Sequence, residues 1–275
     1  MIGVMKDIKE MNKLIVLLFL LIVMVPAGTV LAQDSNDYEE MSDEEYEAIL
    51  DNGKMVYEVR CLLCHGENGD GNGLAGVIRR AEKNGRILEI YPRDLTMGVY
   101  RFRTTPTGCL PDDKDLLDII SRGVPRSFMP SHETELSSEE KEATKEYIKT
   151  FSFRFDEEDP CDPIAVEKPL WIGSADSIEK GKKIYQDMKC GECHGYEGKG
   201  DGPKSNELKD DWGNQILPFN FATGDLKRGS SAENVYITFT AGLDGTGMPS
   251  YEDSLNEEDR WHLVSYTLRL MNKVN

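Results

Sequence analysis

Apolar residues recur along the chain at helical spacing, and Gly- and Pro-rich stretches separate the segments in which they do so. In the first such segment, Tyr46, Ile49, Leu50, Val56 and Tyr57 fall on one face of a helix. The stretches between these segments have little strand character. The pattern therefore predicts an all-α protein built from short helices and long loops.

Two further helices are predicted near residues 136–151 and 255–270. The first opens with Ser137 followed three residues later by Glu140, and the second with Asn256 followed by Asp259. An oxygen-bearing residue three positions before an acid is typical of a capped helix start, and acids stabilise the first turn. We expect both segments to begin as capped helices.

The first 32 residues have a different pattern. Three lysines precede twelve uninterrupted apolar residues, and small residues follow up to a predicted cleavage after Ala32. This order is typical of a secretory signal peptide. The alternative is an uncleaved membrane anchor, although a membrane span needs about twenty apolar residues. Both readings place the rest of the chain outside the cytoplasm, in the periplasm or an equivalent compartment.

The chain is strongly acidic and long enough for about two domains. Its 275 residues carry a net charge of −18, which becomes −19 once the three lysines and two acids of residues 1–32 are removed. Such a surface would repel nucleic acid. It favours a protein partner with a basic docking face. The alternative is that the acidic surface only keeps the protein soluble.

The sequence repeats itself internally. GKMVYEVRCLLCHGENGDGNG from Gly53 matches GKKIYQDMKCGECHGYEGKGDG from Gly181, and GVPRSFMP from Gly123 matches GLDGTGMP from Gly242. The segments from residues 136 and 255 match as well. Three matching blocks in the same order indicate a duplicated domain. We expect one domain at residues 33–154, an acidic, Pro-containing linker at 155–170, and a second domain at 171–275.

Each repeat contains the pattern C-x-x-C-H, the attachment signature of a c-type haem. The two thiols add to the two vinyl groups of the haem, and the adjacent imidazole becomes an axial ligand of the iron. The two motifs therefore predict two covalent haem c groups. Their thioether residues would be Cys61, Cys64, Cys190 and Cys193, and their proximal ligands would be His65 and His194.

With these motifs, both halves resemble class I cytochromes c, and the whole chain resembles a dihaem cytochrome c of two domains. The resemblance covers nearly all of residues 40–154 and 174–272. It implies helices wrapped around a haem in each half, with the first and last helices crossing at a glycine against an aromatic residue. Carried over to this chain, Gly53 would meet Tyr147, and Gly181 would meet Tyr266.

Two methionines are candidates for the sixth iron ligand. Of eleven methionines, Met129 and Met248 occupy matching positions in the two repeats, each before a proline. A thioether opposite a neutral imidazole raises the reduction potential, whereas an ordinary methionine fills gaps in a core. His132 is an alternative ligand, but Tyr251 replaces it in the second repeat. We expect His262, within the last helix, to be a packing or surface residue.

Cys109 and Cys161 remain once the haem cysteines are assigned. An even remaining pair in an oxidising compartment predicts a disulfide, which would hold the linker against the first domain. The alternative is that Cys109 ligates a haem as thiolate, as in the dihaem thiosulfate dehydrogenases that the chain partly resembles in layout.

The segment YPRDLTMGVYRFR from Tyr91 resembles the family's loop beside the haem propionates, and LPFNFATGDLKRG from Leu217 is its counterpart. Arginine pairs well with carboxylates. Candidate propionate contacts are therefore Arg93, Arg101 and Arg103, with ordinary surface arginines as the alternative.

The function predicted from these residues is one-electron transfer between redox partners, with two His/Met haems as a relay and no enzymatic activity of its own. By analogy with proteins of this layout, the partner would be a quinol-oxidising complex, a terminal oxidase or a periplasmic molybdenum oxidoreductase. A membrane would be involved only if the N-terminal segment stays uncleaved. The alternative is a dihaem enzyme, a peroxidase or a thiosulfate dehydrogenase, in which one haem has an exchangeable or thiolate ligand.

Overall fold

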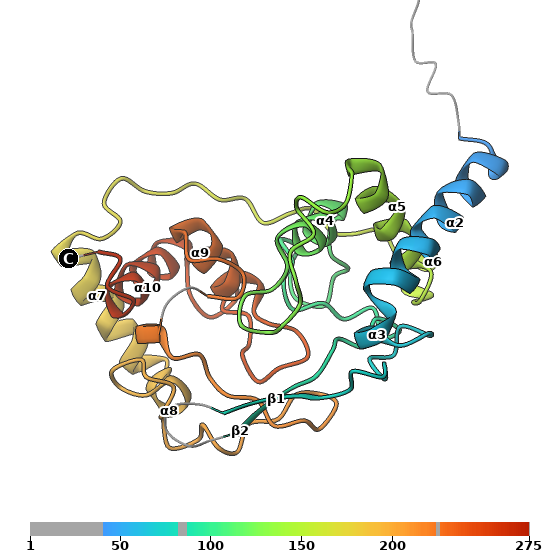
Figure 1. Ribbon diagram of the computed structural model, residues 1–275. Helices are drawn as coiled ribbons and strands as arrows, with labels where there is room; N and C mark the ends of the chain where they lie inside the picture. Colours follow the sequence, from blue (N-terminus) through green and yellow to red (C-terminus); the bar gives the residue numbers. More distant parts are fainter. Residues whose placement is uncertain (1–40, 82–86, 224–225, 275) are drawn as a thin grey trace, which may run out of the picture. The chain divides into compact units, whose positions relative to one another are not determined.

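Each half of the chain begins with a helix, continues into a one-turn helix that carries the C-x-x-C-H motif, and ends with another helix (Figure 1). The computed structural model describes residues 41–81, 87–223 and 226–274, so the predicted signal segment lies outside the described residues. The helices of the first half are α2 (Asp43–Arg60), α3 (Leu62–His65), α4 (Asp113–Arg122), α5 (Ser138–Lys149) and α6 (Arg154–Glu157). Those of the second half are α7 (Ala175–Asp187), α8 (Gly191–His194), the 3-10 turn η1 (Phe221–Thr223), α9 (Ala232–Ala241) and α10 (Glu257–Leu270).

The predicted helix starts at α5 and α10 are confirmed. The Ser137 hydroxyl accepts a hydrogen bond from the Glu140 backbone N–H, and the Glu140 carboxylate accepts one from the Ser137 N–H. At α10, the Asn256 side chain accepts from the Asp259 N–H and donates to the Asp259 carboxylate. These bonds satisfy N–H groups that a helix start leaves unpaired.

In both halves the first and last helices cross at a glycine, as the resemblance implied. A Cβ placed on Gly53 in α2 would overlap the carbonyl of Ala143 in α5 and lie 2.8 Å from the Cβ of Tyr147. A Cβ on Gly181 in α7 would meet α10 in the same way, 2.9 Å from the Cβ of Tyr266. Glycine is therefore required for the two backbones to approach this closely.

Each half has its own apolar core. In the first half the core includes Tyr57, Leu116 and Ile120, and in the second half it is built around Trp261 and Leu263. From residue 43 onward, the chain forms one compact unit. Within residues 41–81, 87–223 and 226–274, no helix is long and apolar enough to cross a membrane.

A small antiparallel hairpin departs from the all-α prediction. Strands β1 (Ile78–Ala81) and β2 (Ile87–Ile90) pair with Ile78 opposite Ile90 and Ala81 opposite Ile87. The hairpin lies in the first half, between the haem motif and the segment from Tyr91. The fold is otherwise helical, as predicted.

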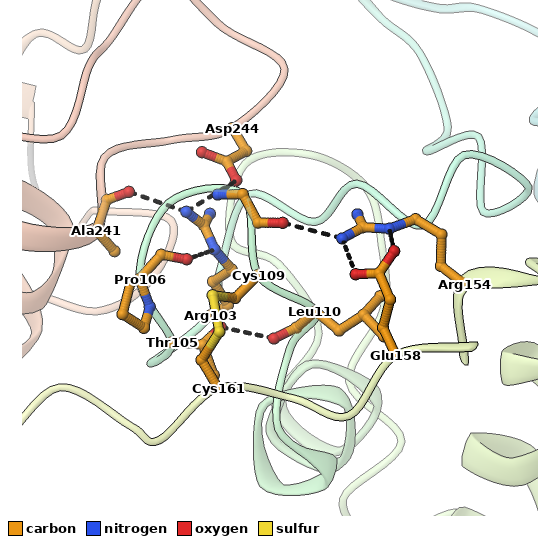
Figure 2. The surroundings of a disulfide bond; sticks show 11 residues. Arg103, Thr105, Pro106, Cys109, Leu110, Arg154, Glu158, Cys161, Ala241 and Asp244 are labelled. Carbon is orange, nitrogen blue, oxygen red and sulfur yellow. Dashed lines mark hydrogen bonds and ion pairs between the residues drawn. A yellow bond between two sulfur atoms is a disulfide. The ribbon is translucent and has the colours of Figure 1, made fainter. Parts of the chain in front are cut away.

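The predicted linker begins differently from the expectation, because its first residues belong to α6. Arg154 forms an ion pair of 2.6 Å with Glu158, four residues later, which favours one helical turn. Residues 158–169 then form neither helix nor strand. A disulfide between Cys109 and Cys161 holds this segment to the first half (Figure 2). The Ile164 N–H also donates to the Thr104 carbonyl at 2.8 Å.

A buried arginine joins the two halves (Figure 2). Arg103 has no solvent exposure. Its guanidinium donates to the backbone carbonyls of Tyr100, Pro106 and Ala241, and it forms an ion pair of 2.8 Å with Asp244. Ala241 and Asp244 belong to the second half, so this side chain connects the halves directly.

Candidate functional site

The two motif histidines are held in the same way in both halves. His65, at the end of α3, has its Nδ1 atom 3.1 Å from the carbonyl oxygen of Arg93. His194, at the end of α8, has its Nδ1 atom 3.2 Å from the carbonyl oxygen of Phe219, the residue that matches Arg93 in the repeat. A carbonyl can only accept, so Nδ1 carries the hydrogen and Nε2 keeps a free lone pair. Burial lowers the pKa of both imidazoles, which favours the neutral form that binds iron.

The loop after each motif is also fixed identically. The Tyr57 hydroxyl donates to the Gly66 carbonyl at 2.7 Å, and the Tyr185 hydroxyl donates to the Gly195 carbonyl at 2.6 Å. Gly66 and Gly195 have φ values of 79° and 80°, a backbone region open mainly to glycine. The glycine directly after C-x-x-C-H and the tyrosine before it therefore form one unit that ends the one-turn helix.

A single cavity of about 1010 Å³ extends along both motifs. This volume lies at the upper end of the range for small-molecule and cofactor sites. Buried apolar side chains such as Leu116, Ile120 and Leu263 form part of its wall. The predicted haem residues that line it are Cys61, His65, Met129, Cys190, Cys193, His194 and Met248. Cys64 lies in α3 immediately before His65.

The segments that carry the two methionines share one backbone geometry. The Val124 N–H donates to the Met129 carbonyl at 3.1 Å, and the Leu243 N–H donates to the Met248 carbonyl at 3.1 Å. Both methionines are partly buried and line the cavity. Each half therefore brings a histidine with a free Nε2 and a methionine to the same cavity.

The first of these segments contains two residues in a strained left-handed conformation, Arg126 and Phe128, the latter with a φ of 62°. Arg126 has a φ of 65°, while the matching position of the second half is Gly245, with a φ of 73°. A left-handed conformation costs a non-glycine residue roughly 1–2 kcal/mol. The arginine side chain lies over the ring of Phe219, 5.3 Å from its centroid, so this strained residue contacts the other half.

Positive charge and unpaired donors line the cavity. Arg93 and Arg101 both line it, and burial lowers the pKa of Arg93 to about 9. The Nε atom of Arg101 and the hydroxyl of Tyr100 are buried without a hydrogen-bond partner in the described part of the chain. Buried donors of this kind cost free energy unless an acceptor reaches them. A haem fits these residues, because its carboxylates are acceptors and its ring is apolar.

Burial affects two of the motif thiols strongly. Burial raises the pKa of the Cys61 and Cys190 thiols to about 11, so both stay protonated near neutral pH. None of the four motif cysteines takes part in a disulfide.

Other predicted residues lie away from the cavity. Arg103 is engaged between the halves, as described above, and is not among the cavity-lining residues. His132 is buried but does not line the cavity either. His262 packs within the second half, with its ring 4.5 Å from that of Trp171 and its Nδ1 atom 2.9 Å from the Ser177 hydroxyl. The sulfur of Cys109 is bonded to Cys161.

Comparison with known proteins agrees with this geometry. The family model described as cytochrome c matches residues 178–270, and that of the cbb3-type cytochrome c oxidase subunit III matches residues 48–148. A solved structure, from the reducing HAO-like protein complex Kustc0457/Kustc0458 of Kuenenia stuttgartiensis, is 42% identical in sequence. The match covers 80% of this chain and 95% of that chain, with a TM-score of 0.72. The chain belongs to the cytochrome c family. No curated protein matches it.

In this two-domain cytochrome c, sequence reasoning missed three kinds of contact. It did not identify the backbone carbonyls of Arg93 and Phe219 as histidine acceptors. It also missed Lys227, which lines the cavity, although Lys227 is the repeat counterpart of Arg101. Finally, it did not identify Arg126, which lines the cavity and contacts Phe219 of the other half. Position-by-position comparison of the two repeats would have found the lysine.

Proposed function

We propose that the protein carries two haem c groups, one in each half, and transfers single electrons between redox partners. Cys61, Cys64 and His65 would hold the first haem with Met129, and Cys190, Cys193 and His194 the second with Met248. Haem iron supplies the one-electron chemistry. The chain's residues hold the imidazoles by their Nδ1 atoms, exclude water with apolar walls and place positive charge nearby.

The observation that supports this proposal best is the duplicated geometry of the ligand residues. The two Nδ1 hydrogen bonds differ by 0.1 Å in length, and both methionine segments close with the same bond of 3.1 Å. The shared cavity further supports a relay, because the predicted ligand residues of both halves line it.

The partner we propose is an HAO-like oxidoreductase, because the similar Kuenenia chain comes from a complex of that kind. The net charge of −18 would favour a basic docking face on that partner. A quinol-oxidising complex, a terminal oxidase and a periplasmic molybdenum oxidoreductase are the other partner classes. The proposed location is the periplasm or another extracytoplasmic compartment.

A dihaem enzyme has less support. Thiolate ligation requires a free Cys109 sulfur, and this sulfur is in a disulfide. A His132 ligand would have to reach a cavity that this residue does not line.

The test is a haem count per chain, followed by paramagnetic resonance and far-red absorption of the oxidised protein. We expect two haems, both low-spin with methionine ligation. Met129→Ala should abolish the methionine signal of one haem and Met248→Ala that of the other. Met188→Leu is the matched control, because Met188 also lines the cavity but does not precede a proline. One haem per chain, or a Met129→Ala variant with unchanged spectra, would overturn the proposal.

A further inference from the structure

The outer side of α2 carries apolar side chains that face solvent. Gly53, Val56 and Tyr57 are the buried residues of this helix, and they lie on the side that packs against α5. Successive residues of an α-helix are turned by about 100°, so Met55 and Val59 lie one turn apart on the opposite side. Both are exposed, and α2 therefore presents an apolar strip to solvent.

This strip continues into α3, which follows α2 directly (Figure 1). Leu63 lies in α3, between the motif residues Cys61 and Cys64. The Ala75 N–H donates to the Leu63 carbonyl at 2.8 Å, which places Leu74 beside α3. The exposed fractions of the four side chains are 61% for Met55, 76% for Val59, 57% for Leu63 and 93% for Leu74. We call these four residues the α2–α3 face.

The second half has the same backbone arrangement with charged side chains in these places. The residues that match the first three members of the face, in order, are Lys183, Asp187 and Glu192. Lys183 forms an ion pair with Asp187, and Glu192 forms one with Lys204. The fold therefore does not require apolar residues at these positions. Exposed apolar residues that cluster without a structural need mark an interaction surface.

The two matching segments also differ in net charge. Residues 175–204 contain six acids and six lysines, and four ion pairs join residues of this segment. Residues 47–75, all of which the structure describes, contain five acids and two cations, which leaves a charge of −3. One of these two cations, Arg60, pairs outside the segment with Glu135. The first half thus combines its apolar face with uncompensated acidic charge.

The acids of α2 lie beside the apolar face. Glu47, Asp51 and Glu58 follow one another at helical spacing along one edge of it, and all three are exposed. None of them forms an ion pair within residues 41–81, 87–223 and 226–274. The cation on the same edge is Lys54, so negative charge predominates there.

These charges determine what would bind to the face. A second copy of the chain would place the same acids against each other, and a membrane surface with anionic lipids would be repelled in the same way. An apolar surface surrounded by lysine and arginine matches both the face and its edge. An apolar centre inside a polar rim is also the usual anatomy of a protein interface.

We propose that the α2–α3 face binds a redox protein that presents an apolar surface within a rim of lysine or arginine, and that electrons pass between this partner and the first half. The inference rests on the proposed function, since it assigns the exchange with the partner to the haem proposed at Cys61 and Cys64. Leu63 lies between these two cysteines, so a partner on the face is adjacent to that haem site. The matching face of the second half takes no part in this contact.

The experiment measures binding of the full-length holoprotein to the second protein of the similar Kuenenia complex, by calorimetry at low salt. Met55→Lys/Val59→Asp installs the residues of the second half and leaves the net charge unchanged. We expect its dissociation constant to rise roughly tenfold or more, because the loss of central apolar contacts is costly. Leu63→Glu should weaken binding as well. Its matched control is Leu170→Glu, because Leu170 is fully exposed but lies in the linker.

A second set of variants tests the acidic edge through the association rate. In Glu47→Gln/Asp51→Asn/Glu58→Gln, we expect the rate constant at low salt to fall and its salt dependence to weaken. The control removes the same number of exposed acids from the linker. It is Asp159→Asn/Asp162→Asn/Glu167→Gln, and it should change the rate much less.

Binding that is equal in the face variants and their linker controls, or absent in the wild type, would overturn the proposed face. So would self-association of the wild type, or its binding to phosphatidylcholine or phosphatidylglycerol vesicles, if Leu63→Glu abolishes it. The face would then contact a second copy or a membrane. Two haems per chain in every variant would leave the proposed function standing in each of these cases. One haem per chain in the wild type would overturn the proposed function itself.

Discussion

Opening the disulfide should destabilise the first half without altering the proposed haems. The bond between Cys109 and Cys161 spans 52 residues, and this loop contains α4, Met129 and α5. In the chain-entropy treatment, a loop of this length contributes about 4 kcal/mol to the free energy of unfolding. Cys161→Ser should remove most of this contribution.

The assay is urea unfolding of the holoprotein, followed by the methionine-to-iron absorption of the oxidised haems. With a typical slope of about 2 kcal/mol/M for a domain of this size, the midpoint of the first half should fall by about 2 M. Cys109→Ser should give the same shift, and reduction of the wild-type protein should reproduce it.

The same variants distinguish the two predicted roles of Cys109. Neither cysteine lines the cavity, so the spectra and potentials of both proposed haems should stay unchanged. A loss of stability below about 1 kcal/mol would refute the entropy reasoning. A changed ligand spectrum in Cys109→Ser alone would show that Cys109 ligates a haem, and the dihaem-enzyme alternative would then be favoured.

Three further predictions concern the packing and the charges. Gly53→Ala and Gly181→Ala should each lower stability by about 3 kcal/mol in urea unfolding, because the new Cβ overlaps a facing helix carbonyl. Arg103→Met should cost about 3 kcal/mol and speed proteolysis between the halves, because the partly buried Asp244 carboxylate loses its counter-charge and the Ala241 carbonyl loses its donor. Burial raises the pKa of Asp113, but hydrogen bonds from two lysines of α5 lower it, and the net pKa lies below the usual value of 3.8. The Asp113 carboxylate therefore stabilises the folded chain above that pH, and this stabilisation is lost on acidification. Asp113→Asn should therefore flatten the decline of the melting temperature below about pH 4.

The repeat made much of the fold predictable from the sequence. Helix caps depend on residues three positions apart, so Ser137 and Asn256 marked the starts of α5 and α10. The glycine crossings could be assigned because the family requires a glycine there, and Gly53 and Gly181 are placed accordingly. These features are either local in the sequence or duplicated within it.

Features that depend on tertiary contact were not predictable in this way. A backbone carbonyl carries no residue-specific signal, so the acceptors at Arg93 and Phe219 could not be identified. The role of Arg103 could not be predicted, because it depends on an ion pair with Asp244, more than a hundred residues away in the sequence. The hairpin was missed for a different reason. The sequence between the two strands contains an Asn-Gly pair, which is a known hairpin signal, but the all-α prediction did not include it.

The way in which the two repeats differ indicates how they work together. The positions that hold the histidines are matched almost atom for atom, whereas the positions at the boundary between the halves have diverged. Arg103 aligns with Gly229, Arg126 with Gly245 and Arg93 with Phe219. In each pair the first half has the arginine, and that arginine contacts the second half. The second half contributes as well, because Arg228 donates to the Arg103 carbonyl and pairs with Asp115. Two independent carriers on a flexible linker would have no need of such contacts. These contacts support the proposed relay, in which electrons would cross between two halves that are held together.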